Sequence, residues 1–273
     1  MLVKEVRITM PMSAEEFRRG QLYSCSKTSL LETGGGEGVQ ILEDRPFKSK
    51  PMFNGMYNSG RYTKKIYHLE SKAPGWIQKL APKGALKLHE ECWDSYPYTR
   101  TVSINPDYMK QDFEARTETL VVDNDRGEQH NVHHLSADLL SQREVVYIDI
   151  AHDAIEKADY KLEEDPKLFT SKKTGRGPLN SINWKRQVKP VCTVYKLVTI
   201  QFKMWIVQSY AKSYLFSSQK RLLIQYHRRI FCWIDEWYGL TMNDIRKLER
   251  KTNNNLEQQR NKGSRRGINL LGL

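Results

Sequence analysis

A predicted strand with a lysine on its inward face is the feature that most constrains this fold. Residues 61–69 combine β-forming side chains with an alternation of period two, which is typical of a β-strand. Lys65 then shares a face with Thr63, Tyr67 and Leu69, a face that otherwise looks buried. An unpaired ammonium is costly to bury, so such a face needs water, a carboxylate or an anionic ligand. An edge strand whose lysine reaches solvent is the alternative that this segment alone leaves open.

Length and composition indicate a soluble globular protein. The 273 residues suit one large domain or two small ones, and 39% of them are hydrophobic. No apolar run approaches the ~18 residues that a membrane span needs. Charged residues interrupt the first seven positions too early for a signal peptide. We therefore expect a cytoplasmic protein.

Metal and cofactor chemistry find no support in the sequence. The four cysteines are far apart and form no Cys-x-x-Cys pair: Cys25, Cys92, Cys192 and Cys232. They are typical of reduced thiols and not of a zinc or disulfide framework. Three histidines within residues 130–134 lack the cysteine or carboxylate spacing of a metal motif. We expect no metal, no cofactor and, because paired acids and a Ser/His/Asp arrangement are also missing, no enzyme activity.

A net charge of +12 implies an anionic partner, either nucleic acid or an anionic membrane surface. Much of the excess lies within residues 246–266, although a basic helical end is often only a solvated face. No aromatic-basic RNA-binding strand and no helix-turn-helix pattern accompany the charge. The sequence therefore favours a membrane surface over nucleic acid.

The order of predicted elements indicates an α+β fold with a large, mostly antiparallel sheet. We expect strands at residues 3–10, 39–42, 61–69, 85–93, 98–104, 113–122, 145–150 and 191–203. Helices are expected after Ser13, at 74–80, at 136–141 and through most of the C-terminal third, where 222–237 carry an apolar stripe. Two capping boxes mark helix starts: Ser13 with Glu16, and Thr241 with Asp244 before the last helix. Residues 153–190 should be loop. Long C-terminal helices that cover a curved sheet can leave a cavity between the two layers.

Polar residues recur on the inward faces of the predicted strands and of the last helix. Glu249 is the anomaly in that helix, on the stripe of Ile245, Thr252 and Leu256. The strands contribute Thr63, Lys65, Thr99, Thr101, Thr117, Thr119 and Lys196. Sparse hydroxyls and two cations in an apolar cavity would suit an amphiphile with a phosphate-bearing head. The β propensity of threonine is a simpler explanation for each threonine taken singly.

Several blocks, in the same order, resemble the single-domain phosphatidylinositol transfer proteins. They include residues 33–39 (TGGGEGV), 62–69 (YTKKIYHL), 80–86 (LAPKGAL), 146–150 (VYIDI), 174–179 (TGRGPL), 195–199 (YKLVT) and 231–235 (FCWID). The likeness runs from Leu2 to about Glu257. It implies a START-like helix-grip fold in which a concave sheet and helices enclose one phospholipid, with its head group deepest.

The resemblance also implies function and organisation. Residues 1–257 would form the lipid-binding domain, and residues 258–273 a basic, flexible tail. The chain would be a monomer that exchanges phosphatidylinositol and phosphatidylcholine between membranes and touches their surfaces only transiently. A START-like carrier of another lipid, such as a sterol, a sphingolipid or phosphatidic acid, is the alternative.

The site residues implied by the resemblance fall into five groups. Thr63, Lys65, Asp94 and Glu249 would contact the inositol ring. Gln21, Thr101, Thr119 and Lys196 would lie at the lipid phosphate, with Glu90 and Thr99 near the head group. Met204 and Trp205 would dock at the membrane, where Trp favours the headgroup level. Ser171 matches a regulatory serine position, although an ordinary loop serine beside basic residues is equally compatible.

Three of these positions depart from the family pattern. Met204 and Trp205 stand where the family has a Trp-Trp pair for membrane docking, so we expect docking to be weaker but not absent. Asp94 stands where the family has an inositol-binding Asn, and a carboxylate accepts hydrogen bonds but cannot donate one. If Asp94 lies near Glu249, repulsion should raise one of the two pKa values. Thr99 replaces a cysteine beside the choline site, so we expect thiol reagents to lose that target.

Overall fold

The computed structural model describes residues 1–69, 82, 86–203 and 208–264 of the chain. Eight strands form within them: β1 (Leu2–Met10), β2 (Gly38–Phe47), β3 (Gly60–His68), β4 (Lys87–Ser95), β5 (Tyr98–Asn105), β6 (Lys110–Asp123), β7 (Glu144–Ile148) and β8 (Cys192–Phe202). The helices are α1 (Ala14–Glu32), α3 (Ala137–Gln142), η2 (Leu162–Glu164), α4 (Trp184–Gln187), α5 (Gln208–Cys232), α6 (Ile234–Trp237) and α7 (Met242–Arg260).

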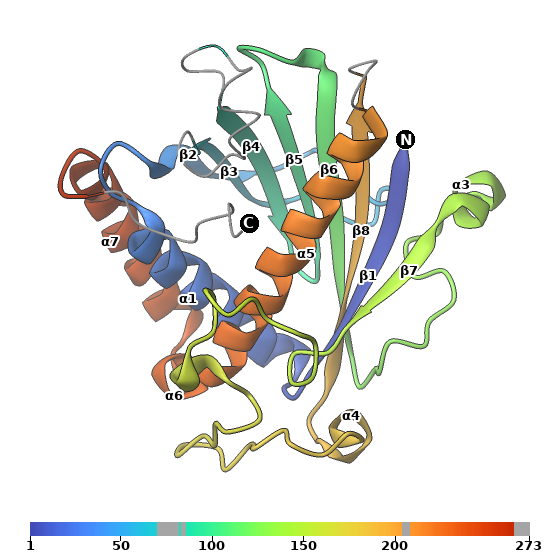
Figure 1. The fold of residues 1–273 in the computed structure, drawn as a ribbon, viewed down its shortest axis with the longest axis vertical. Helices are drawn as coiled ribbons and strands as arrows, with labels where there is room; N and C mark the ends of the chain where they lie inside the picture. The colour runs from blue at the N-terminus through green and yellow to red at the C-terminus, as the bar shows by residue number, and fades with distance from the viewer. Residues whose placement is uncertain (70–81, 83–85, 204–207, 265–273) are drawn as a thin grey trace.

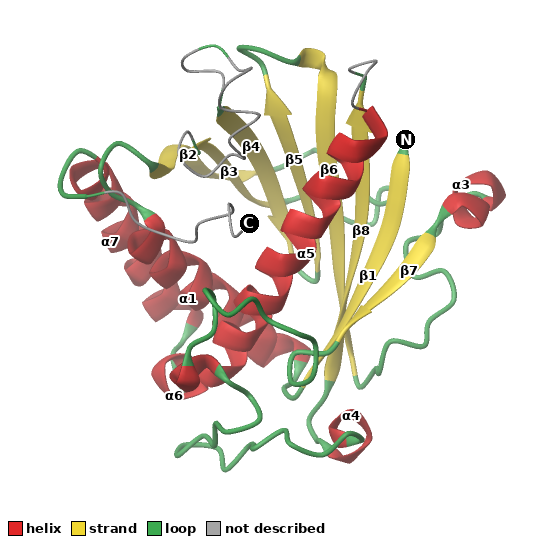
Figure 2. Cartoon of the chain, viewed as in Figure 1, coloured by secondary structure: helices red, strands yellow, loops and turns green. Residues whose placement is uncertain are grey.

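All eight strands join one sheet in the order β2-β3-β4-β5-β6-β8-β1-β7. Every pairing is antiparallel except that of β1 with β7, which is parallel. Helices α1, α5 and α7 lie on one side of this curved sheet (Figure 1), whereas the short helices α3 and α4 lie beside its β7 edge and beyond its lower end (Figure 2). The predicted α+β helix-grip architecture is confirmed.

Local sequence signals explain where the two flanking helices begin. The Ser13 hydroxyl accepts a hydrogen bond from the backbone N–H of Glu16 at 3.2 Å, and the Glu16 carboxylate accepts one from the Ser13 N–H. Thr241 and Asp244 form the same reciprocal cap at the start of α7. Each cap satisfies backbone donors that have no partner within the helix. Both predicted capping boxes are confirmed.

The main core lies between the sheet and the helices. It joins fully buried residues of β1 and β8, such as Ile8 and Val194, to Phe17 of α1 and to Trp237. Gly20 of α1 is required for this packing, because a Cβ there would lie 2.8 Å from the Trp237 ring. The opposite face of the sheet carries a smaller aromatic cluster: Phe47, Met52, Phe53, Tyr62, Trp93 and Tyr98.

Two predictions needed correction in the C-terminal half. The apolar stripe at 222–237 is not one helix, because α5 ends at Cys232 and Trp233 begins the short α6. Leu222, within α5, is 38% exposed and does not belong to the buried stripe. The connection at 153–190 is mostly irregular as expected, but it contains η2 and α4.

The last helix extends beyond the predicted domain. Helix α7 continues to Arg260, beyond the domain boundary predicted at residue 257. The helix predicted at 74–80 lies outside the described residues. Among the helices that the structure describes, none is long and apolar enough to cross a bilayer.

Candidate functional site

Strand register brings the predicted polar residues together on one face of the sheet. Lys65 of β3 lies opposite Glu90 of β4. Asp94 pairs with Thr99, Thr99 with Thr119, and Thr119 with Lys196, in a row that crosses four strands. Because side chains alternate along a strand, residues opposite one another share a face.

A second row runs parallel to the first, two residues further along each strand. Thr63 lies opposite Cys92, Cys92 opposite Thr101, and Thr101 opposite Thr117. The threonines that the sequence singled out are therefore neighbours across the sheet. Their common position explains them better than β propensity, which would not gather them in two adjacent rows.

The helices close over these rows and leave a cavity of about 130 Å³, which we call the inner cavity. Six predicted site residues line it: Gln21, Thr63, Lys65, Asp94, Thr99 and Glu249. The rest of its lining is Leu22, Cys25, Ser26, Ser29, Ile41, Asp44, Arg61, Cys92, Tyr226, Arg246, Thr252 and Asn253. Helices α1, α5 and α7 and strands β2 to β5 thus all contribute to one polar enclosure.

Lys65 is one of three cationic side chains that line this enclosure, with Arg61 and Arg246. Its Nζ lies 3.8 Å from Glu90 Oε1, and the Tyr67 hydroxyl donates to the same oxygen at 3.0 Å. The side chains of Cys25, Tyr67 and Glu90 raise the pKa of Lys65 well above its ordinary value, against the opposing effect of burial. Of the three, Glu90 is the carboxylate, and it lies opposite Lys65 on the neighbouring strand. Among the described residues Lys65 Nζ donates no hydrogen bond, so this ammonium can donate to a further acceptor in the cavity.

Glu249 is held by an arginine one turn earlier on α7. Arg246 donates through Nη1 to Glu249 Oε2 at 2.7 Å. On the same helix, the buried hydroxyl of Thr252 has no hydrogen-bond partner among the described residues, although it lines the cavity. The α7 wall therefore presents a carboxylate, a guanidinium and an unpaired hydroxyl, a set that suits a ligand with several hydroxyl groups.

Asp44 and Arg61 complete the site, and sequence reasoning missed both. Arg61 Nε donates to Asp44 Oδ1 at 2.5 Å, and Asn253 of α7 donates to the other oxygen at 3.1 Å. Arg61 has the same parity as Lys65 on β3, so period-two alternation could have found it. Asp44 could not have been found in this way, because the β2–β3 register shifts between Ile41 and Glu43 and disrupts the alternation.

Asp94 and Glu249 both have raised pKa values, but the expected repulsion between them is not the cause. Burial raises the pKa of Asp94, while Thr99, Arg18, Arg246 and Arg61 oppose that shift. Burial also raises the pKa of Glu249, with a smaller contribution from Asp44. The expected repulsion between Asp94 and Glu249 is thus not the cause, since guanidinium groups lie around both acids. Thr99 donates to Asp94 Oδ1 at 3.1 Å.

The predicted phosphate residues divide between two places. Gln21 lines the inner cavity, whereas Thr101, Thr119 and Lys196 lie next to it in the rows described above. Lys196 Nζ donates to the Thr119 hydroxyl at 3.2 Å. Burial lowers the pKa of Lys196 to about 8, and the opposing effect of Cys92 is smaller.

Ser171 lies apart from these residues. It is 2% exposed, and its hydroxyl donates to Asp235 Oδ1 at 2.5 Å. Met204 and Trp205 lie outside the described residues. No group of histidine, cysteine and acidic residues with metal-binding geometry occurs in the described part of the chain.

Fold and site together define a class: a binding protein whose helices cover a polar cavity on one face of a curved sheet. The comparisons with known proteins agree with this class. Residues 1–254 match the family model described as phosphatidylinositol transfer protein. The chain belongs to the phosphatidylinositol transfer protein family.

Individual relatives support the same assignment. The chain is 45% identical to the phosphatidylinositol transfer protein beta isoforms of Bos taurus and Homo sapiens, over all of both chains. It is 39% identical to phosphatidylinositol transfer protein 1 of Dictyostelium discoideum over 95% of this chain and 96% of that protein. It is also 43% identical to membrane-associated phosphatidylinositol transfer protein 2 of Mus musculus, over 92% of this chain and 19% of that longer protein.

Proposed function

We propose that this chain binds one phosphatidylinositol or phosphatidylcholine molecule and exchanges it between membranes. The observation that carries the proposal is the inner cavity, in which Lys65, Thr63 and Glu249 converge from a strand and a helix far apart in sequence. Its hydroxyls, carboxylates and cations match the donors and acceptors of an inositol ring. Membership of a family named for phosphatidylinositol transfer supports the choice of cargo.

In the proposed arrangement, the head group takes the place of water in the polar enclosure. Thr63, Lys65, Asp94 and Glu249 contact the inositol ring, and Glu90 and Thr99 lie nearby. Gln21, Thr101, Thr119 and Lys196 hold the phosphate. A bound phosphate would favour the charged form of Lys196, which burial otherwise disfavours. In this proposal the acyl chains lie among the apolar side chains between sheet and helices and exchange bilayer contacts for protein contacts at little net cost, so capture and release are nearly balanced.

Exchange requires the cavity to open, and α7 is the proposed moving wall. Polar contacts hold it: Asn253 to Asp44, Gln259 Nε2 to the Leu30 carbonyl at 2.5 Å, and the Gly36 N–H to the Arg260 carbonyl at 2.7 Å. Such bonds are worth roughly 0.5–1.5 kcal/mol each in water, so contact with a membrane can replace them. We further propose that Met204 and Trp205 make that contact, and that the protein acts as a cytoplasmic monomer without a cofactor.

Asp94 bears on the choice of lipid. It accepts hydrogen bonds from ring hydroxyls, as Glu249 does, but cannot donate one as an asparagine would. Inositol selectivity in this chain therefore rests more on Lys65, Thr63 and Arg61, which supply donors.

Mass spectrometry of lipids that co-purify with the protein tests the cargo directly, and we expect phosphatidylinositol and phosphatidylcholine. In a vesicle assay with each labelled lipid, Thr63→Ala should lower phosphatidylinositol transfer and spare phosphatidylcholine transfer. Equal loss of both lipids would contradict the head-group assignment. A sterol or a sphingolipid as the dominant co-purifying lipid would contradict the cargo.

A further inference from the structure

Two of the four cysteines line the inner cavity, and the head-group assignment proposed above uses neither of them. Cys25 lies on α1 and Cys92 on β4, and both are partly exposed, whereas Cys192 and Cys232 are buried. An unsatisfied group marks the same cavity as a place for a ligand: Thr252 is 3% exposed, and its hydroxyl has no hydrogen-bond partner among the described residues. A molecule that enters the inner cavity therefore meets two sulfur atoms.

Three of the cysteines are poor nucleophiles, because burial favours the neutral thiol. Burial raises the pKa of Cys92 to about 12, although Lys65 opposes the shift. Burial also raises the pKa of Cys192 and that of Cys232. The thiolate is the form that attacks electrophiles, and these three side chains carry very little of it at neutral pH.

Cys25 differs from the other cysteines because it lies beside the Lys65 ammonium. Among the groups that raise the pKa of Lys65, Cys25 has the largest effect. Cys25 also raises the pKa of Tyr67 and that of Tyr226, so these side chains form one electrostatic cluster. A cation next to a cysteine favours the thiolate.

Helix packing holds this cluster in place. The Tyr226 hydroxyl of α5 donates to the Gln21 carbonyl of α1 at 2.6 Å. In an α-helix the same carbonyl accepts the backbone N–H four residues later, which here belongs to Cys25. Tyr226 therefore packs against the turn of α1 that carries Cys25, and both residues line the inner cavity.

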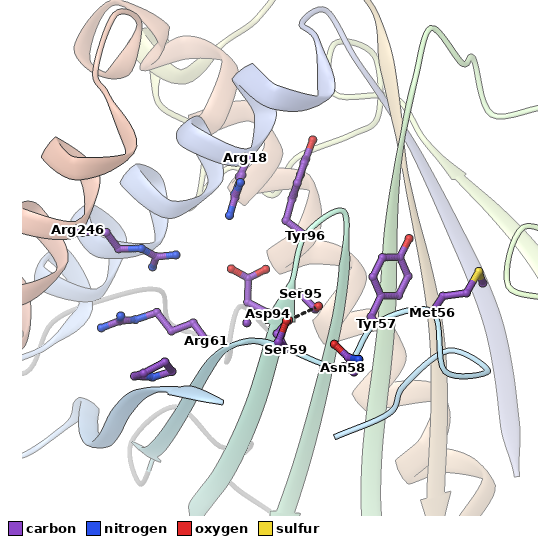
Figure 3. A pocket seen from close by; sticks show the side chains of 12 residues that line it. Arg18, Met56, Tyr57, Asn58, Ser59, Arg61, Asp94, Ser95, Tyr96 and Arg246 are labelled. Carbon is purple, nitrogen blue, oxygen red and sulfur yellow. Dashed lines mark hydrogen bonds between the residues drawn. The ribbon is translucent and has the colours of Figure 1, made fainter. Parts of the chain in front are cut away.

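Other cations of this region are directed elsewhere. Arg18 of α1 and Arg246 of α7 point toward the Asp94 carboxylate and favour its charged form (Figure 3). Lys65 donates no hydrogen bond among the described residues, and Cys25 is its strongest electrostatic neighbour. Lys65 is thus the cation that acts on Cys25.

We propose that Cys25 is a modification site for α,β-unsaturated aldehydes of lipid origin, and that the adduct closes the inner cavity to the head group. The reaction adds the thiol S–H across the C=C bond. The Cys25 sulfur bonds to the β-carbon, the π electron pair moves toward the carbonyl oxygen, and the α-carbon gains a proton that the Lys65 ammonium can supply. The proton released when the thiolate forms balances the one that the α-carbon takes up, so the step needs no oxidant and no cofactor.

The chemistry of the cavity selects this class of reagent. Sulfur is a soft, polarisable nucleophile, and a conjugated C=C bond is a soft electrophile. An aldehyde with an alkyl chain enters bilayers and reaches the cavity by the route of the phospholipids, a step that rests on the proposed function. The inner cavity measures about 130 Å³, so an alkyl group fixed to Cys25 takes space that the head group needs.

The test exposes the wild type, Cys25→Ser and Cys92→Ser to hydroxynonenal at neutral pH, and peptide mass spectrometry maps the adducts. Cys92→Ser is the matched control, because it removes a sulfur from the same cavity and leaves Cys25 in place. Cys25 should form the thioether at least about tenfold faster than Cys92, since burial keeps Cys92 in the thiol form.

Two lysine variants test the role of the ammonium. Lys65→Met should slow the reaction of Cys25 about threefold, because the thiolate fraction falls more than the intrinsic nucleophilicity of the sulfur rises. Lys64→Met removes the neighbouring lysine, which pairs with Glu91, and should leave the rate unchanged. Circular dichroism confirms that all variants fold.

Vesicle assays measure the consequence for transfer. Treated wild type and treated Cys92→Ser should lose most of their phosphatidylinositol transfer relative to their own untreated samples, whereas Cys25→Ser should keep its untreated rate. Hydroxynonenal is supplied in vesicles, and iodoacetamide serves as the water-soluble thiol reagent for comparison.

Equal labelling of the four cysteines, or a Schiff base on Lys65 in place of the thioether, would overturn the assignment of Cys25. Reaction with iodoacetamide in solution but not with hydroxynonenal in vesicles would overturn the lipid source and retain a reactive thiol. A thioether on Cys25 with unchanged transfer would overturn the closure of the cavity. If the untreated wild type transfers no phosphatidylinositol, the proposed function fails, while the adduct map still tests Cys25.

Discussion

The inward lysine of β3 provides the sharpest test, because the chain supplies its own control on the other face of the sheet. Lys65 and Glu90 lie opposite each other on the cavity face, 3.8 Å apart. Lys64 and Glu91 are the next cross-strand pair, also 3.8 Å apart, on the outer face. Side-chain exposure is 15% and 18% for the inner pair and 33% and 35% for the outer pair. The two pairs thus differ in burial and in access to the cavity.

The stability effects should differ accordingly. At 3.8 Å the attraction is about 4 kcal/mol for an effective dielectric constant near 20, and desolvation offsets part of it. We expect Lys65→Met to lower the free energy of unfolding by about 1–3 kcal/mol, because Glu90 is left partly buried without its cation. Lys64→Met should cost about 1 kcal/mol or less, since water screens the outer pair. Urea denaturation measures both values.

A double variant separates stability from lipid binding. Adding Glu90→Gln to Lys65→Met removes the unpaired charge and should restore most of the lost stability. Phosphatidylinositol transfer between vesicles should remain at least about tenfold below wild type in both, because a charge-assisted bond to the head group is gone. Phosphatidylcholine transfer should persist. Recovery of phosphatidylinositol transfer in the double variant would show that Lys65 acts only as the partner of Glu90. A loss of phosphatidylinositol transfer in Lys64→Met as large as that in Lys65→Met would refute the role of the cavity face.

Three further predictions follow from buried contacts. Because burial lowers the pKa of Lys196 to about 8, Lys196 in the empty site loses its proton as pH rises through that value. Phospholipid extraction from vesicles should therefore weaken above about pH 8. Lys196→Met should remove this pH dependence in the same assay at graded pH. Ser171→Glu sets a second carboxylate against Asp235 inside a 2%-exposed site, so it should lower the thermal midpoint more than Ser171→Ala, and equal midpoints would contradict this packing. Gly20→Ala places a Cβ 2.8 Å from the Trp237 ring and should cost about 1–3 kcal/mol in urea denaturation, whereas an unchanged midpoint would show that the ring moves freely.

Local signals allowed much of the architecture to be predicted. The alternation at 61–69 located β3, and the Ser13 and Thr241 capping boxes located the starts of α1 and α7. These signals depend on near neighbours in the chain, so sequence spacing is sufficient to recognise them. The break after Cys232 was missed, because an apolar stripe continues across a helix end when both sides of the break pack on the same core.

The site residues were recognised where parity or a family motif marked them. Arg61, Asp44, Arg18 and the pairing of Arg246 with Glu249 were not recognised. Asp44 lies beyond an irregularity in β2, which breaks the period that would have revealed its face. Arginines on helix surfaces are ordinarily solvated, so nothing in the sequence distinguishes Arg18 from Arg19.

The sequence by itself determined that an inward cation lies on β3 and that an acid lies on the inward stripe of the last helix, because side-chain direction follows from the period of each element. Tertiary structure alone decided which groups meet. Register placed Lys65 against Glu90, and helix packing set Arg18 and Arg246 around Asp94. The physical reason is that contact across an enclosed cavity depends on how separate elements pack, and that arrangement is fixed by the whole core.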